Sequence, residues 1–156
     1  MAEMQEADSF LTVRRDTVAT PAQVWAVIAD GWSYSQWVVG NGRMRAVDAD
    51  WPAPGSKIHH TIGIWPLTIN DETVVETCTP EKELVLRAKT RPFGGARITL
   101  RLKETATGCR IEMSEVPVGG PLDFVPRRLA LAAVWPRNRE CTWRLAAHAE
   151  RRTQPD

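Results

Sequence analysis

The sequence predicts an α+β domain, built from one antiparallel sheet of about seven strands and a long C-terminal helix. Three observations predict this class. Two short helical segments follow a first strand, strand-like segments between proline and glycine turns fill the middle, and apolar residues recur at steps of three and four near the C-terminus. At 156 residues the chain is long enough to bury a core without disulfides or a metal.

The N-terminal elements are a strand over residues 10–18 and two short helices. Residues 20–23 read Thr-Pro-Ala-Gln, a capping box in which Thr20 and Gln23 satisfy free backbone amides at the start of the first helix. Gly31 ends that helix, because glycine readily adopts the left-handed conformation that closes a helix. A second helical turn follows over residues 32–37.

The middle of the chain, from Arg43 onward, has the punctuation of an antiparallel meander, with strands of about 6 to 10 residues between turns. The best-defined turn is Trp65-Pro66, which places Ile62 opposite Ile69. A shift by one residue would mix apolar with polar partners, so the pattern fixes the register. The same register places His60 opposite Asp71 on the apolar face.

The His60 and Asp71 pair has two interpretations. In the first, Asp71 orients His60 and raises its basicity, so that His60 acts on a ligand as a hydrogen-bond donor or general base. In the second, the two side chains form a satisfied polar pair in a partly hydrated interior. Both residues are therefore candidate catalytic residues.

The C-terminal helix presents one stripe, formed by Leu131, Val134, Asn138, Cys141, Leu145 and His148. Pro136 removes a backbone donor and predicts a kink or a division into two helices. Asn138 then either shares an enclosed space with His60 and Asp71 or caps the break at Pro136. Cys141 is most simply a small core residue.

Tryptophan is unusually frequent, with 7 Trp against 3 Phe and 1 Tyr. Trp25 and Trp143 lie on predicted helices, where they can pack. Four others lie in or beside loops, where indoles either rim the entrance of a cavity or plug the ends of the fold: Trp32, Trp37, Trp51 and Trp65.

Composition excludes several classes. The chain has an odd number of cysteines, and they lack a C-x-x-C spacing: Cys78, Cys109 and Cys141. This pattern indicates reduced thiols in a cytoplasmic protein.

The sequence has no run of 18 apolar residues and no secretion signal, and its net charge is +1. No phosphate-binding loop, dinucleotide fingerprint or nucleophile elbow occurs. His59 and His60 are adjacent on a strand and point to opposite faces, so they cannot bind one metal ion together. We therefore expect no transmembrane segment, nucleic-acid partner, cofactor or metal.

The order of elements resembles that of the START-like (SRPBCC) superfamily, and within it the polyketide cyclase/dehydrase and lipid-transport group. The residues that carry the resemblance are 18–30, Trp32, Trp37, Pro54-Gly55 and 137–145. The resemblance covers residues 9–152 as a single domain and leaves 1–8 and 153–156 as flexible termini. It implies a helix-grip fold, in which a curved sheet grips the C-terminal helix around an apolar cavity. The cavity-facing positions would be His60, Ile62, Ile69, Asp71, Leu86, Ile98, Leu100, Met113, Asn138, Cys141 and Leu145.

The resemblance implies a function class and leaves alternatives open. The first is binding of a small hydrophobic molecule, a lipid, polyketide or aromatic compound. The second is a cofactor-free cyclase or dehydratase that uses His60 oriented by Asp71. The third is a protein-interaction or chaperone-regulator module that uses the Arg-rich end, with Arg137, Arg144, Arg151 and Arg152. The sequence leaves the oligomeric state undetermined.

Overall fold

The structure, a computed structural model, describes residues 12–90 and 94–152. The predicted flexible termini, 1–8 and 153–156, lie outside the described residues. The strands are β1 (Val13–Thr17), β2 (Asn41–Val47), β3 (Lys57–Ile64), β4 (Leu67–Thr79), β5 (Glu83–Thr90), β6 (Gly94–Thr105) and β7 (Gly108–Val118). The helices are α2 (Pro21–Ala29), α3 (Tyr34–Trp37) and α4 (Arg127–Arg151), with short 3-10 turns η1 (Gly31–Ser33) and η2 (Pro121–Phe124).

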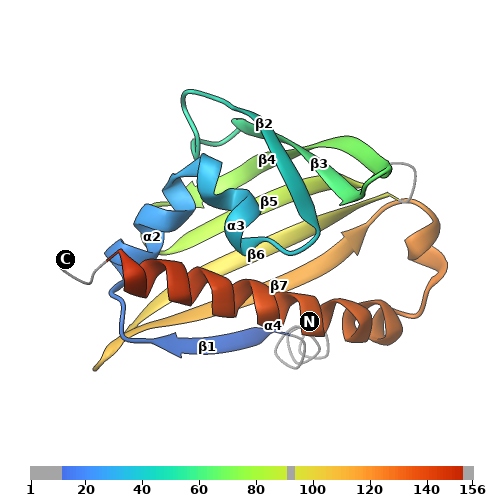
Figure 1. Ribbon diagram of the computed structural model, residues 1–156. Coiled ribbons are helices and arrows are strands. Elements are labelled where there is room, and N and C mark those ends of the chain that lie inside the picture. The colour runs from blue at the N-terminus through green and yellow to red at the C-terminus, as the bar shows by residue number, and fades with distance from the viewer. Residues whose placement is uncertain (1–11, 91–93, 153–156) are drawn as a thin grey trace.

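The strands form one seven-stranded antiparallel sheet in the order β1-β7-β6-β5-β4-β3-β2. Figure 1 shows the sheet curving around α4, with α2 and α3 beside the helix. Helix α4 contacts β1 and β7 on the sheet, and α2 and α3 pack against it. This arrangement confirms the predicted α+β helix-grip fold.

The start of α2 follows the predicted capping box. The backbone amide of Gln23 donates to the Thr20 hydroxyl at 3.3 Å, and the Thr20 amide donates to the Gln23 side chain at 2.8 Å. Val24, Val27 and Ile28 then bury one face of the helix in the core. The indole of Trp51 donates to the Ile28 carbonyl at 3.1 Å, which attaches the β2–β3 connection to this helix.

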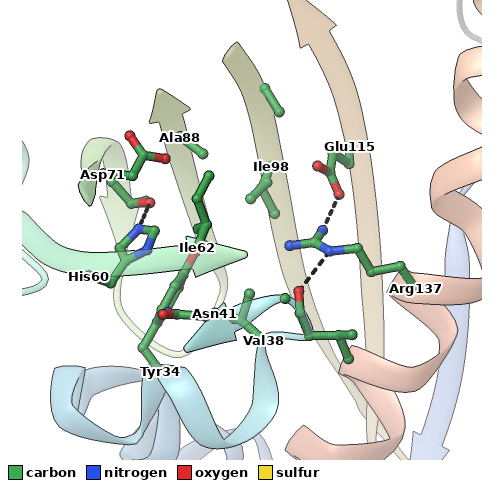
Figure 2. Close-up of a pocket in the computed structure, with 14 residues that line it drawn as sticks. Tyr34, Val38, Asn41, His60, Ile62, Asp71, Ala88, Ile98, Glu115 and Arg137 are labelled. Carbon is green, nitrogen blue, oxygen red and sulfur yellow. Dashed lines mark hydrogen bonds and ion pairs between the residues drawn. The ribbon is translucent and has the colours of Figure 1, made fainter. Parts of the chain in front are cut away.

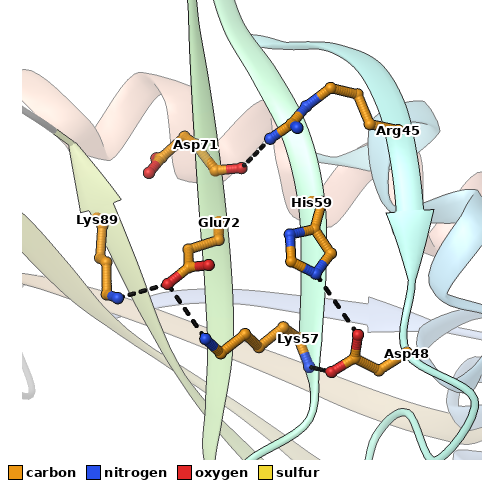
Figure 3. Close-up of polar contacts among 7 residues, drawn as sticks. All are labelled: Arg45, Asp48, Lys57, His59, Asp71, Glu72 and Lys89. Atoms are coloured by element: carbon orange, nitrogen blue, oxygen red, sulfur yellow. Dashed lines mark hydrogen bonds and ion pairs between the residues drawn. The ribbon is translucent and has the colours of Figure 1, made fainter.

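The register of the β3/β4 hairpin is the one that the sequence predicts. Ile62 lies opposite Ile69, Ile64 opposite Leu67, and His60 opposite Asp71. The hairpin is joined to β2 on one side and to β5 on the other. On its outer face, Glu72 forms ion pairs with both Lys57 and Lys89 (Figure 3).

Helix α4 is continuous, and the predicted division into two helices at Pro136 is wrong. Pro136 lies inside the helix on an exposed position. On the opposite side Cys141 and Leu145 are fully buried in the core, together with Ala149. This packing holds the helix together across the proline, because tertiary burial outweighs the loss of one backbone hydrogen bond. Asn138 therefore caps no break.

Candidate functional site

A pocket of about 260 Å³ lies between the sheet, the segment after α3, and α4 (Figure 2). Its polar lining residues come from six different elements or their connections: Tyr34, Asn41, His60, Asp71, Thr73, Glu115 and Arg137. Its apolar lining residues are Val38, Val39, Ile62, Ala88, Ala96 and Ile98. The space is about that of nine water molecules, since each occupies about 30 Å³ in the liquid.

His60 is a strongly perturbed titratable group of this pocket. Burial, together with the nearby charges of Arg45 and His59, lowers its pKa to about 4. The imidazole is therefore neutral at pH 7. Its Nε2 atom lies 2.9 Å from the hydroxyl oxygen of Thr73, whereas its buried Nδ1 atom has no hydrogen-bond partner among the described residues.

Tyr34 extends this contact into a chain of three polar groups. Burial raises the pKa of its hydroxyl to about 12, and a hydrogen bond with Thr73 offsets part of that rise. The Tyr34 and His60 rings lie 5.7 Å apart. The Thr73 hydroxyl thus joins the phenol to the imidazole. Which ring nitrogen carries the proton depends on the direction in which this chain donates.

Arg137 crosses the other side of the pocket and binds two elements together (Figure 2). Its Nη1 donates to Glu115 Oε2 at 2.7 Å, and its Nε donates to the Val39 carbonyl at 2.8 Å. Glu115 belongs to β7 and Arg137 to α4, so the ion pair closes the space between sheet and helix. The guanidinium is largely matched by this carboxylate.

Two buried polar atoms in the pocket lack a partner in the described part of the chain. They are Nδ1 of His60 and Oδ1 of Asn41. A buried polar atom without a hydrogen bond costs about 1–3 kcal/mol, so such atoms in a native structure require an explanation. Both atoms belong to residues that line the same pocket, although each atom is itself covered by protein.

The family described as "Polyketide cyclase / dehydrase and lipid transport" matches residues 11–150. The chain belongs to this family. A search of curated proteins found no match. Within the described residues, no helix is long and apolar enough to cross a membrane.

Solved structures support the family assignment at the level of the fold. A protein of unknown function, SA2116 from Staphylococcus aureus, has a TM-score of 0.69 at 13% identity, covering 92% of this chain and 94% of that one. A Rhodobacter sphaeroides protein has a TM-score of 0.67 at 23% identity, covering 90% and 91%. Ara h 8.0201 has a TM-score of 0.67 at 10% identity, covering 90% and 96%.

Only four of the eleven cavity-facing residues that the family resemblance implied line the pocket. They are His60, Ile62, Asp71 and Ile98. Six others are buried core residues outside the lining: Leu86, Leu100, Met113, Asn138, Cys141 and Leu145. Their large side chains fill the centre of the grip, so the pocket lies only toward one end of the sheet. Ile69 is 41% exposed, because it lies on the outer part of the β3/β4 hairpin.

The tryptophan positions also differ from the expected cavity entrance. Trp37 and Trp51 are buried in the core, where Trp37 packs edge-on against Tyr34 at 5.3 Å. Trp32 and Trp65 are exposed, and neither lines the pocket. Trp143, expected to pack inside, is half exposed on the outer side of α4. The position of a tryptophan in or beside a loop therefore did not predict the entrance of the pocket.

Asp71 lies opposite His60, as the predicted register requires. His60 turns to Thr73, and burial lowers its pKa instead of Asp71 raising it. Asp71 lines the pocket and also borders the more open, charged surface near Arg45 and Lys89. The Arg45 guanidinium donates to the Asp71 carbonyl at 3.1 Å (Figure 3).

The sequence analysis missed ten lining residues: Tyr34, Val38, Val39, Gly40, Asn41, Thr73, Ala88, Ala96, Glu115 and Arg137. A signal existed for Thr73 and Glu115. Thr73 follows Asp71 by two residues on the same face of β4, and Glu115 follows Met113 by two on β7. A carboxylate in an apolar alternation demands a partner, which is Arg137.

Proposed function

We propose that the protein binds a small, partly apolar molecule in the pocket between the sheet and α4. One observation carries the proposal: apolar walls and polar side chains from six elements or their connections converge on one pocket of about 260 Å³ between the sheet and α4. A pocket with apolar walls and a few convergent polar groups is the usual form of a ligand site. The polyketide cyclase / dehydrase and lipid-transport family supports a hydrophobic-ligand fold.

Binding is favoured over proton-transfer catalysis by the state of His60. The enzyme alternative needed Asp71 to make His60 a stronger base, and the imidazole instead has a pKa of about 4 and contacts Thr73. A base is most effective when its pKa lies near the working pH. A neutral imidazole at pH 7 serves better as a fixed hydrogen-bonding group.

The arginine-rich end gives little support to an interaction module. Arg137 is engaged in the pocket, Arg144 pairs with Glu140, and Arg152 pairs with Asp30. These guanidinium groups are already matched within the molecule. The charge run is therefore mainly a set of internal contacts and solvated positions.

Isothermal titration with para-ethylphenol at pH 7 tests binding in the pocket. Ala88→Leu places a larger side chain into the lining and should weaken binding at least tenfold. Val85→Leu enlarges a residue that alternates to the opposite face of the same strand, and should leave binding within about twofold. Absence of binding to a panel of small phenols and alcohols, or equal affinities of the two variants, would contradict the proposal.

A further inference from the structure

The end of the β3/β4 hairpin projects beyond its neighbours in the sheet. Strand β4 pairs with β5 from Thr73 onward, and β3 pairs with β2 up to Ile62. Past these points β3 and β4 pair only with each other in the described part of the chain, and Ile64 opposite Leu67 is their last pair. The projecting part is therefore a narrow, two-stranded finger.

The finger ends in three large apolar side chains, which we call the apolar tip. Ile64 is 87% exposed, Trp65 84% and Leu67 83%. Residues 61–70 contain no charged side chain. Single exposed apolar side chains are common on soluble domains, but a group of this kind marks an interaction surface.

A second apolar protrusion occurs at the same end of the molecule. Phe124 of η2 is 92% exposed, and Leu129 in the first turns of α4 is 63% exposed. Figure 1 shows η2 and the start of α4 at the same end as the β3/β4 hairpin but apart from it. This end therefore presents two separate apolar points and not one flat apolar face.

The unmatched charges beside these two points are positive. The backbone amide of Arg43 donates to the Thr61 hydroxyl at 2.9 Å, which places this arginine beside the hairpin, and Arg128 precedes Leu129 in α4. Both arginine side chains are exposed, and neither forms an ion pair with another described residue. The last carboxylate of β7, that of Glu115, is already matched by Arg137.

The area of the apolar tip is small for a stable protein partner. An indole buries about 150–250 Å² and an aliphatic side chain about 100 Å², so the tip offers on the order of 400 Å². A stable protein complex buries about 800 Å² on each partner. Two separate apolar points would also require two matching hollows in a rigid partner.

A lipid bilayer imposes neither requirement, because its fluid surface adapts to each protrusion. Indoles favour the boundary between headgroups and acyl chains, where the ring is buried and its N–H group is hydrated. Arginine side chains beside such a ring are attracted to anionic headgroups.

We propose that this end of the molecule docks on the surface of an anionic lipid bilayer. The apolar tip of Ile64, Trp65 and Leu67 inserts about 5–10 Å into the boundary region, and Arg43 and Arg128 lie at the level of the headgroups. This peripheral contact is separate from ligand binding in the pocket. It requires no ligand there.

Sedimentation with sucrose-loaded vesicles tests the docking of the full chain at pH 7. Phosphatidylcholine vesicles with 30% phosphatidylglycerol should bind the protein at least tenfold more tightly in 0.1 M NaCl than pure phosphatidylcholine vesicles. This preference should fall below threefold in 0.5 M NaCl, because salt screens the arginine charges. Binding should also shift the tryptophan emission to shorter wavelength.

Two variants test the apolar tip, and each has a matched control. Trp65→Ser and Ile64→Ser should each weaken binding to the anionic vesicles at least fivefold, and Trp65→Ser should lose the emission shift. Trp32→Ser and Val18→Ser remove an exposed indole and an exposed aliphatic side chain away from the hairpin, and both should bind as the wild type does. All four positions are exposed, so the variants should fold.

A third variant tests the charge. Arg128→Gln should weaken binding to the anionic vesicles about fivefold and leave binding to pure phosphatidylcholine unchanged. Arg110→Gln makes the same change in net charge near the β6–β7 turn and should bind as the wild type does.

Three results would overturn the proposal. The first is that the wild type binds neither kind of vesicle, and the second is that Trp65→Ser and Ile64→Ser both bind as tightly as their controls. The third is that Trp65→Ser dissociates a dimer in sedimentation velocity while vesicle binding is unchanged, because a second copy of the chain would then cover the tip. Affinity for para-ethylphenol is measured separately and tests only the pocket.

Discussion

At the scale of single residues, the two sides of the pocket present different polar groups. His60 is buried beside the Thr73 hydroxyl and stays neutral, whereas the Glu115 carboxylate is matched by Arg137. The two sides of the pocket therefore differ in kind. One offers neutral hydrogen-bonding groups, and the other a closed ion pair.

The neutral state of His60 predicts a specific loss of stability in acid. Its folded pKa of about 4 lies below the ordinary value of 6.5, so the unfolded chain binds more protons between these pH values. Stability from this group is complete above pH 6.5 and falls by up to about 3 kcal/mol as the pH drops to 4. Urea unfolding from pH 7 to pH 4 measures this fall.

His60→Gln should remove this component, giving a shallower dependence of the unfolding free energy on pH, even if the variant is less stable at pH 7. His59→Gln changes the neighbouring histidine on the other face of β3 and should retain most of the slope, because burial is the largest cause of the lowered His60 pKa and the charge of His59 is a smaller one. Equal slopes in the wild type and His60→Gln would show that His60 is not the group responsible.

At the scale of elements, the β3/β4 hairpin depends on one glycine. Gly63 has a φ of +100°, and a Cβ atom there would lie 2.4 Å from the Leu67 carbonyl oxygen. Gly63→Ala should therefore destabilise the protein by about 1–3 kcal/mol. Gly42→Ala on β2, with φ outside the positive region and 3.2 Å to the Thr61 hydroxyl, should be milder in a thermal unfolding experiment.

Helix α4 carries a proline that its packing tolerates. Pro136→Ala would restore a backbone donor within the helix, and the interior proline costs up to about 3 kcal/mol relative to alanine. The gain is reduced because proline also restricts the unfolded chain. We expect the variant to be more stable by about 1–2 kcal/mol in denaturant unfolding. A clear loss of stability would show that the core around Cys141 needs the local shape that proline imposes.

The elements also show which structural features can be predicted from the sequence. The capping box at Thr20 and the β3/β4 register were predictable because each depends on residues close in sequence. The continuity of α4 was not, because it depends on burial of Cys141 and Leu145 against distant strands. The direction of the His60 ring was equally hidden, since alternation gives the face of a side chain but not which neighbour it bonds.

At the scale of the whole molecule, the helix grip is divided into a filled centre and a small pocket at one end. Leu86, Leu100, Met113 and Leu145 occupy the centre, and all four are essentially inaccessible. The extent of the pocket was unpredictable from sequence, because it depends on how side chains from several strands and α4 add up in volume. Family membership alone suggested a longer cavity.

This division predicts that stability and binding respond to different substitutions. Leu100→Ala should cost about 2–5 kcal/mol of unfolding free energy, because it leaves a cavity in the core. Its affinity for para-ethylphenol should stay within about threefold of the wild type. Calorimetric titration and urea unfolding of the same samples check both. A parallel loss of binding would indicate that the centre and the pocket are one continuous space.

The sheet order has a consequence for the time at which the fold can form. Strand β1 has β7 as its strand partner, and α2 and α3 pack against α4. During synthesis at about 5–20 residues per second, the first elements to leave the ribosome thus wait on the order of ten seconds for the last ones. The hairpins from β3 to β6 can meanwhile pair one after another, since each joins its immediate predecessor. Until α4 emerges, the early helices expose the apolar faces that chaperones bind.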